Sequence, residues 1–349
     1  MQRVPVSVLF AISFSLMPAP QSCGGVVENG NFVSHVQSLR DLTFDEDTGL
    51  YVAPTNTERA NFALAAATLL SGDIATAETQ AAVVNYEVVQ YTDSVSTDVY
   101  YGLREVNNTP TRGWGSYFVN LSAAHDVLLE VPHPRFDTNS WDVAARAFRD
   151  SDSRGFMMAG AHRNTNGAST ADVAHLSDSI FQEVHEAWVG ESAERTAYSI
   201  HGFNDENHAF PAGTDAVLSS GDGTVSTAVN ALDDQLDGAG FLSYAYNTLN
   251  VNDAANVAVN ELVDGTTFAS LGGTTNKQGV YSRGQGGDFV HVELEQSIRF
   301  DESNRSAAAG AIASAITAVP EPSSVALMGL VTVIAWIRRI HPRRFCRTP

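Results

Sequence analysis

Cysteine is nearly absent from this chain of 349 residues. Only Cys23 and Cys346 occur, one near each end. The long stretch between them contains no thiol, so no disulfide framework can hold it together. A chain of this length can instead bury a sizeable hydrophobic core, and we expect that core to supply the stability.

Positive charge is also scarce. Lys277 is the single lysine, and 20 basic residues stand against 40 acidic ones, a net charge of −20. Without Arg3, Glu321 and the five arginines beyond residue 337, 14 basic and 39 acidic residues remain, a net charge of −25. Phosphate binding needs clustered lysine and arginine, so the composition argues against nucleic acid as a partner. Such a surface also weakly repels anionic polymers.

Long apolar runs are confined to the two ends. At the first end, residues 4–17 are apolar, follow Arg3 and precede small and polar residues. This layout is typical of a secretory signal peptide, and the run is too short for a comfortable transmembrane helix. We therefore expect residues 1–25 to be a signal peptide.

At the second end, Pro320-Glu321-Pro322 precedes an apolar segment over 325–337, and a cluster of arginines follows. The arginines should stay cytoplasmic while the apolar segment holds the chain in the inner membrane. This pattern closely resembles the PEP-CTERM sorting signal of Gram-negative bacteria. The resemblance implies cleavage by an exosortase, transient membrane association, and sorting to the cell surface or extracellular matrix. We expect residues 319–349 to form this segment, with a short transmembrane stretch.

Between the ends, the residue pattern changes once. Valine- and tyrosine-rich stretches over 80–106 and 113–121 predict antiparallel strands at a sheet edge. After Asp126, strand patterns alternate with helix patterns, which favours an α/β fold with a mixed, mostly parallel sheet. We expect this domain to span residues 80–318, with residues 26–79 as an N-terminal extension.

Two segments of this domain bear on the site. Residues 170–188 have apolar residues at helical spacing and predict one amphipathic helix. The glycine-rich residues 272–288 predict a loop, either a substrate-binding flap or a plain mobile surface loop.

Three predicted strands are each followed by a histidine: His133, His162 and His201. In open α/β sheets the carboxyl ends of the strands form the edge that binds ligands, so these histidines are candidate site residues. Asp137 follows His133 by four residues. The alternative is that His133 is a surface loop residue and Asp137 a helix cap.

A further candidate lies in the stretch "FVHVELE" at 289–295. Strand alternation puts His291, Glu293 and Glu295 on one face. Glu293 falls in mid-strand, where a carboxylate is costly unless it is paired or faces a cavity. It is therefore a candidate catalytic residue; an edge strand with one solvated face is the alternative.

The series "VPHPRFD", "GAHRN", "ADVAH", "IHGF" and "FVHVELEQSIR" resembles zinc hydrolases of the carboxypeptidase-like (phosphorylase/hydrolase-like) α/β fold. It is more closely similar to bacterial relatives grouped with N-formylglutamate amidohydrolase and poly-γ-glutamate hydrolase. The resemblance implies a three-layer fold with helices on both faces of the sheet. It also implies Zn²⁺ bound by His133, Asp137 and His201, a zinc-bound water as nucleophile, and Glu293 as general base.

The match departs from the carboxypeptidase pattern at one ligand. That pattern has a glutamate three residues after the first histidine, where this chain has Phe136 and places its acid at Asp137. Asp172 and His175 could complete the site instead, or form a buried pair that ties a helix to the sheet.

The chemistry of the remaining polar residues suggests their roles. Arg163 is a candidate for binding a substrate carboxylate, because its planar guanidinium matches one in a bidentate way; a salt bridge to Asp152 or Asp172 is the alternative. We expect four further histidines not to be ligands, because none stands at a strand end in the same register: His125, His185, His208 and His291.

Two functions follow from these expectations. The first is a secreted or surface-sorted zinc-dependent hydrolase of amide or peptide bonds, acting on a peptide-like or N-acyl amino acid substrate. The second is a catalytically inactive matrix or surface protein that retains the hydrolase fold.

Overall fold

The structure, a computed structural model, describes residues 25–190, 195–247, 262–264 and 268–319. The expected signal peptide, up to residue 24, and the expected transmembrane stretch at 325–337 lie outside these ranges. Within these ranges, no helix has the length and apolar character that crossing a membrane requires.

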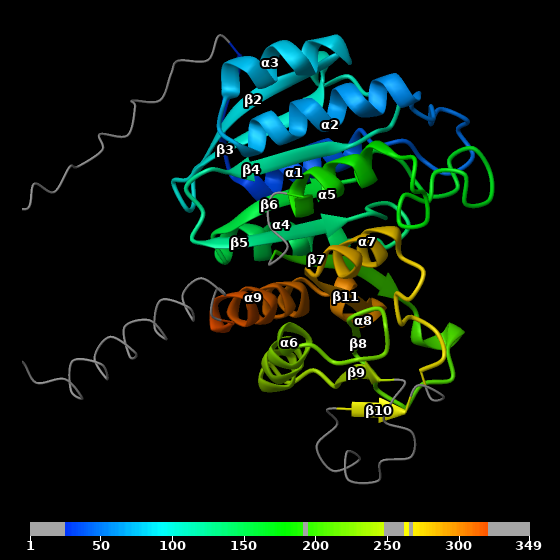
Figure 1. The fold of residues 1–349 in the computed structure, drawn as a ribbon. Helices are drawn as coiled ribbons and strands as arrows, with labels where there is room; N and C mark the ends of the chain where they lie inside the picture. Colours follow the sequence, from blue (N-terminus) through cyan, green and yellow to red (C-terminus); the bar gives the residue numbers. More distant parts are fainter. Residues whose placement is uncertain (1–24, 191–194, 248–261, 265–267, 320–349) are drawn as a thin grey trace, which may run out of the picture.

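One mixed sheet of eleven strands runs through the molecule (Figure 1), in the order β1-β2-β3-β4-β6-β5-β7-β11-β8-β9-β10. The strands, in chain order, are β1 (Val26–Gly30), β2 (Tyr86–Asp93), β3 (Val99–Glu105), β4 (Ser116–Asn120), β5 (His125–Val131), β6 (Ser153–Met158), β7 (Thr196–Phe203), β8 (Ala216–Ser219), β9 (Ser243–Asn247), β10 (Leu262–Asp264) and β11 (Asp288–Glu295).

The sheet is mostly parallel, as the sequence predicts. The β2, β3, β4 and β6 strands pair antiparallel in turn, and β8 pairs antiparallel with β11. The other neighbours pair parallel, including the central series β6, β5, β7 and β11. Because β5, β7 and β11 point the same way, residues at their carboxyl ends meet at one edge of the sheet.

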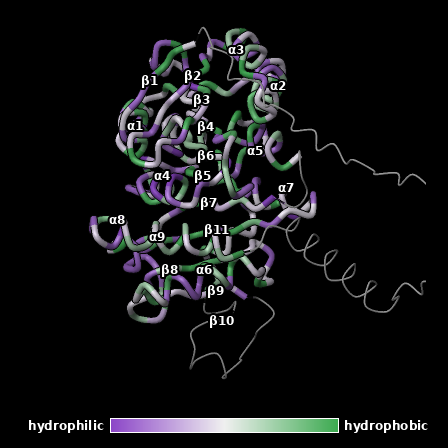
Figure 2. Tube along the Cα trace, turned by 90° about the vertical axis from the view of Figure 1, so that its left-hand side faces the viewer, coloured by the Kyte–Doolittle hydropathy of each residue, from purple (hydrophilic) through white to green (hydrophobic). Residues whose placement is uncertain are grey.

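Helices cover both faces of the sheet, which confirms the three-layer α/β architecture (Figure 2). α1, α4, α6, α8 and α9 pack into one hydrophobic cluster, and α2, α3, α5 and α7 into another on the opposite face. The helices are α1 (Phe32–Asp41), α2 (Asn56–Leu70), α3 (Ile74–Val83), α4 (Ser140–Asp150), α5 (Ile180–Gly190), α6 (Thr227–Gly238), α7 (Lys277–Gln285), α8 (Gln296–Phe300) and α9 (Glu302–Ala318), with short 3₁₀ helices η1 (Val106–Asn108) and η2 (Asp205–Asn207).

Residues 26–79, expected as an extension, take part in all three layers. β1 pairs parallel with β2 and forms one edge of the sheet. In α1, Phe32 is fully buried, with its ring centroid 5.2 Å from that of Phe118 in β4. α2 begins with a capping box formed by Thr55 and Glu58 and packs on α5 across the sheet's other face. The segment is thus integrated into the sheet and both helix layers.

Two local predictions near the site are wrong. The helix expected over 170–188 begins only at Ile180, because the Ser179 side chain caps it by accepting a hydrogen bond from the backbone N–H of Gln182 (3.1 Å). Residues 170–179 form turns instead. The loop expected over 272–288 contains α7, which Asn276 caps at its start and Gly286 ends in the left-handed conformation (φ 85°).

Candidate metal centre

The residues at the carboxyl ends of the central strands converge. His133 follows β5 by two residues, and His201 lies in β7 next to it in the sheet. After His133 the chain turns back, and the backbone N–H of Asp137 donates to the carbonyl of His133 (2.8 Å). This turn brings the carboxylate of Asp137 to the two imidazole rings.

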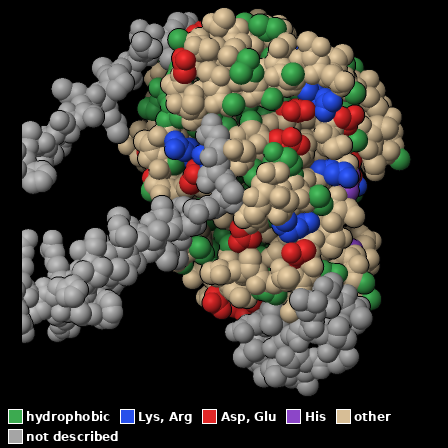
Figure 3. Space-filling model, viewed as in Figure 1, with side chains coloured by type: hydrophobic (Ala, Val, Ile, Leu, Met, Phe, Trp, Pro, Cys, Tyr) green, Lys and Arg blue, Asp and Glu red, His purple; other side chains and the backbone are tan. Residues whose placement is uncertain are grey.

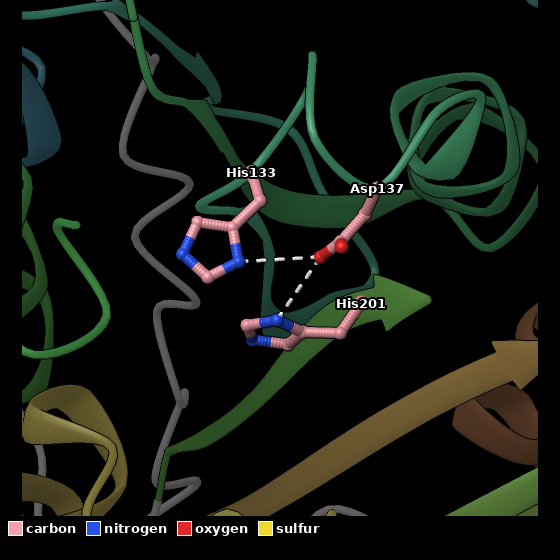
Figure 4. Close-up of side chains that lie close together, drawn as sticks. All are labelled: His133, Asp137 and His201. Atoms are coloured by element: carbon pink, nitrogen blue, oxygen red, sulfur yellow. Dashed lines mark hydrogen bonds and ion pairs between the residues drawn. The ribbon is translucent and has the colours of Figure 1, made fainter. Parts of the chain in front are cut away.

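The carboxylate of Asp137 contacts both rings from one side (Figure 4). Its Oδ2 is 3.2 Å from Nδ1 of His133 and 3.3 Å from Nδ1 of His201. One donor atom from each residue lies within 4.8 Å of the other two. The side chains are buried, at 2%, 3% and 4% exposure for His133, Asp137 and His201. The structure therefore brings together the three residues that the sequence resemblance implies as ligands.

The far nitrogens of both rings have partners that orient them. Nε2 of His133 lies 2.9 Å from Oδ1 of Asp172, and Nε2 of His201 lies 3.1 Å from the hydroxyl of Ser199. Metal-binding histidines commonly donate their second N–H to a carboxylate or similar group, which fixes the tautomer. Here these contacts leave both Nδ1 atoms directed at one point. The donor set and its orientation fit a divalent cation.

The charges of the cluster also favour a cation. Burial by itself would lower the pKa of His133, but hydrogen bonds to Asp137 and Asp172 raise it to about 9. Burial by itself would raise the pKa of Asp137, but His133 and His201 hold it below its usual value. A proton on His133 thus balances two carboxylates, and a bound cation would take over that role.

Asp172 and Arg163 form an outer pair. Arg163 donates through Nη2 to Oδ2 of Asp172, whose other oxygen faces His133. The salt bridge weighed against a substrate role for Arg163 is therefore present. His175, with a side chain 48% exposed, lies 3.2 Å from Asp172. Instead of tying a helix to the sheet, Asp172 supports His133.

A cavity of about 580 Å³ opens at the three donors. Glu293 and His291 from β11 line it, as do Arg163, Arg299 and the exposed rings of Phe136 and Phe300. The guanidinium of Arg163 lies over the Phe136 ring, 5.0 Å from its centroid. This cavity is large enough for a small organic ligand at the donor cluster.

Glu293 is the buried acid of this cavity. It pairs across the sheet with His201, so its side chain stands beside that ligand, and it is 6% exposed. Its Oε2 has no hydrogen-bond partner in the described part of the chain. Burial, and then the charge of Asp137, raises its pKa well above the usual value. A carboxylate with a raised pKa is a stronger base than an ordinary one, which suits proton transfer.

His291 was expected not to be a ligand, and the structure places it among the donors. Its ring centroid lies 4.5 Å from that of His201, and His201, His291 and Glu293 form a second buried group of candidate ligands. The signal was present in the sequence, since the alternation that turns Glu293 inward turns His291 the same way. The register argument considered strand ends only, whereas His291 lies within a strand, two residues before Glu293.

The other histidines in the described part of the chain stay outside both groups. β6 ends at Met158, so His162 lies four residues beyond it, with its ring centroid 5.5 Å from that of Phe136. His185 contacts Glu130 in the core. His208 lines the cavity, and His125 stands at the opposite end of β5 from His133.

Comparison with known proteins bears mainly on the C-terminal end. Residues 318–344 match the PEP-CTERM protein-sorting motif, which confirms the expected sorting segment and implies export with exosortase-mediated surface sorting. No curated protein matches the chain.

Several solved structures show a distant likeness. A gene product of Agrobacterium tumefaciens has 12% identity and a TM-score of 0.39, over 57% of this chain and 92% of its own. A bacteriophage poly-gamma-glutamate hydrolase has 12% identity and a TM-score of 0.36, over 55% and 84%. A Shewanella denitrificans protein assigned as a carboxypeptidase A has 10% identity and a TM-score of 0.34, over 66% and 64%. Likenesses at this level assign no activity to the chain.

Proposed function

We propose that the mature protein is a zinc-dependent hydrolase of amide or peptide bonds. His133, Asp137 and His201 are the zinc ligands. The observation that carries this proposal is their buried convergence, with both Nδ1 atoms directed at the carboxylate of Asp137. Three protein ligands with one position open to water is the usual arrangement of a catalytic zinc.

The chemistry divides between the cation and Glu293. Bound zinc would polarise the scissile carbonyl and lower the pKa of a water molecule toward about 7. Glu293 accepts the proton of the attacking water and passes it to the leaving nitrogen. Its partnerless Oε2 and raised pKa support this role, because the atom is available and a carboxylate with a raised pKa is a stronger base than an ordinary one.

Arg163 is the proposed contact for a carboxylate of the substrate. One nitrogen of its guanidinium is engaged by Asp172. A guanidinium has five N–H donors in a planar fork, so others remain for a ligand in the cavity. A peptide-like or N-acyl amino acid substrate would present such a carboxylate next to the scissile amide. A net charge of −25 for the mature chain disfavours long polyanionic substrates.

The sorting motif places this activity outside the cell in our proposal. An exosortase cleaves the C-terminal segment after an inner-membrane intermediate, and the mature domain ends at the Gram-negative cell surface or in the extracellular matrix. On the face shown in Figure 3, lysine and arginine side chains are scattered rather than gathered.

The sorting motif also favours a second candidate, an inactive matrix or surface protein with the same fold. One experiment separates the two. The mature protein is stripped with a chelator, reloaded with zinc, and assayed on a panel of N-acyl amino acids, peptides and γ-glutamyl polymers. The hydrolase predicts tight zinc and zinc-dependent turnover of at least one substrate class. Tight zinc without turnover on any class would support the inactive protein, and absence of tight zinc would remove the metal site.

A further inference from the structure

A second group of donor atoms lies directly beside the first. His201, His291 and Glu293 each offer a ligand atom within 4.8 Å of the others. β7 and β11 are parallel neighbours in which Glu293 pairs with His201, and His291 lies two residues earlier on the same face. The sheet itself therefore holds this group together, on two of its central strands.

Two atoms of the group are buried without a partner. Among the described residues, Nδ1 of His291 and Oε2 of Glu293 accept or donate no hydrogen bond. The two side chains are 5% and 6% exposed. Nε2 of His291 and Oε1 of Glu293 are 3.8 Å apart, which is too long for a hydrogen bond. Buried polar groups left in this state are costly, so the pair is arranged to receive a ligand.

The protein's own cations near the cavity are engaged elsewhere. Arg299 donates to the backbone carbonyls of Leu294, Thr138 and Phe203. Arg163 donates to Asp172. Both arginines line the cavity, and neither donates a hydrogen bond to Glu293. A cation bound beside Glu293 would supply the direct contact with positive charge that neither arginine makes.

We propose that His291 and Glu293, with His201, hold a second divalent cation. An imidazole nitrogen and a carboxylate oxygen suit zinc and its first-row neighbours such as cobalt and manganese. His201 would bridge the two cations as an imidazolate: Nδ1 faces Asp137, and Nε2, which lies 3.1 Å from the Ser199 hydroxyl, would release its proton to solvent when the second cation binds. Water completes the coordination.

This second site is additional to the proposed hydrolase centre, but the two share Glu293, so this part of the proposal rests on the proposed function. Oε1 is the Glu293 oxygen nearer to His291, and Oε2 is the oxygen without a partner. With Oε1 on the second cation, Oε2 remains to exchange a proton with water. The same carboxylate therefore serves both roles through different atoms.

The test counts bound cations. The mature protein is stripped with a chelator, titrated with Zn²⁺ or Co²⁺ alone, freed of loose metal and analysed by mass spectrometry of its metal content. We expect two equivalents in the wild type and one in His291→Gln. Glu293→Gln, which is nearly isosteric, should give the same loss if His291→Gln folds poorly. His208→Gln is the matched control, because it lines the cavity outside both groups and should keep two equivalents.

The number of bound cations distinguishes failure of the second site from failure of the hydrolase centre. If the wild type binds only one cation per chain, the second site is overturned, whichever substitution abolishes the binding of that cation. Two equivalents that persist in both His291→Gln and Glu293→Gln also overturn it. A single equivalent that only His133→Ala abolishes would leave the hydrolase centre standing, whereas no bound equivalent in the wild type would remove both centres. Thermal melting of each metal-free variant checks that the comparison is between folded proteins.

Discussion

Oδ1 of Asp172 lies 2.9 Å from Nε2 of His133, while Asp137 contacts Nδ1 of the same ring. The imidazole is thus held from one edge by a residue 39 positions later and offers its other edge to the site. Asp172 is itself held by Arg163. The structure therefore gives His133 a fixed orientation before any cation binds.

Asp172→Asn should weaken zinc binding at this centre by about 10- to 100-fold, because the neutral amide lowers the basicity of His133 and holds its ring less firmly. Competition with a chelator of known affinity measures the change. Asp178→Asn, an exposed residue of the same segment, is the control and should bind zinc like the wild type. Equal affinity in Asp172→Asn would show that the contact does not orient the ligand.

His133→Ala and His201→Ala should each abolish tightly bound zinc at the first centre. Two remaining donors cannot hold the ion in a site built for three. Metal analysis after gel filtration measures this, with circular dichroism to confirm folding. If both variants keep as much zinc as the wild type, the ion is bound elsewhere.

Glu293→Gln should lower turnover of a responsive amide or peptide by ~10²-fold or more, because the amide cannot carry a proton. Zinc at His133, Asp137 and His201 should remain. The measurement pairs kcat with metal content on one preparation. Unchanged turnover would remove Glu293 from the mechanism, and loss of all zinc would make it a ligand of the first cation.

The chain isolated from its native host should neither begin at Met1 nor end at Pro349. The signal-peptide layout predicts removal of the N-terminal segment, and the sorting motif at 318–344 predicts removal of the C-terminal segment. Intact mass spectrometry measures both ends at once. A full-length mass would contradict processing, and loss of the N-terminal segment alone would contradict exosortase cleavage.

Stability should fall in mild acid partly through His35. Burial, opposed by Glu28 and aided by Arg104, lowers its pKa from 6.5 to about 4. The folded protein therefore favours the neutral ring. The stability that this preference contributes to the free energy of unfolding is fully present above pH 6.5 and is lost as the pH falls toward 4. It amounts to roughly 1–3 kcal/mol.

Urea denaturation at pH 7, 5 and 4 tests this against His35→Phe, which keeps a ring to stack on Tyr91 (centroids 4.3 Å apart) but cannot take up a proton. The free energy of unfolding of the wild type should drop further between pH 7 and 4 than that of the variant. Parallel curves would show that His35 does not contribute to acid sensitivity.

Local patterns in the sequence determined much of this protein. Alternation in "FVHVELE" put His291 and Glu293 on one face, because strand geometry depends only on neighbouring residues. The shared role of His133 and Asp137 was implied by the family resemblance and not by their four-residue spacing. The alternation of strands and helices after Asp126 predicted the α/β layers, and the residue pattern of the C-terminal end predicted the sorting motif.

Tertiary structure decided how these pieces meet. His133 and His201 are neighbours only because β5 and β7 lie side by side, an order set by the packing of the helices between them and not by either strand. The contact of Asp172 with His133 also depends on how the segments between the strands pack. β1 joins β2 across about sixty residues, and no local pattern marks that pairing. His291 became a candidate ligand only when the pairing of β7 with β11 brought its ring centroid to 4.5 Å from that of His201, because ligand sets form between strands while sequence patterns report on one strand at a time.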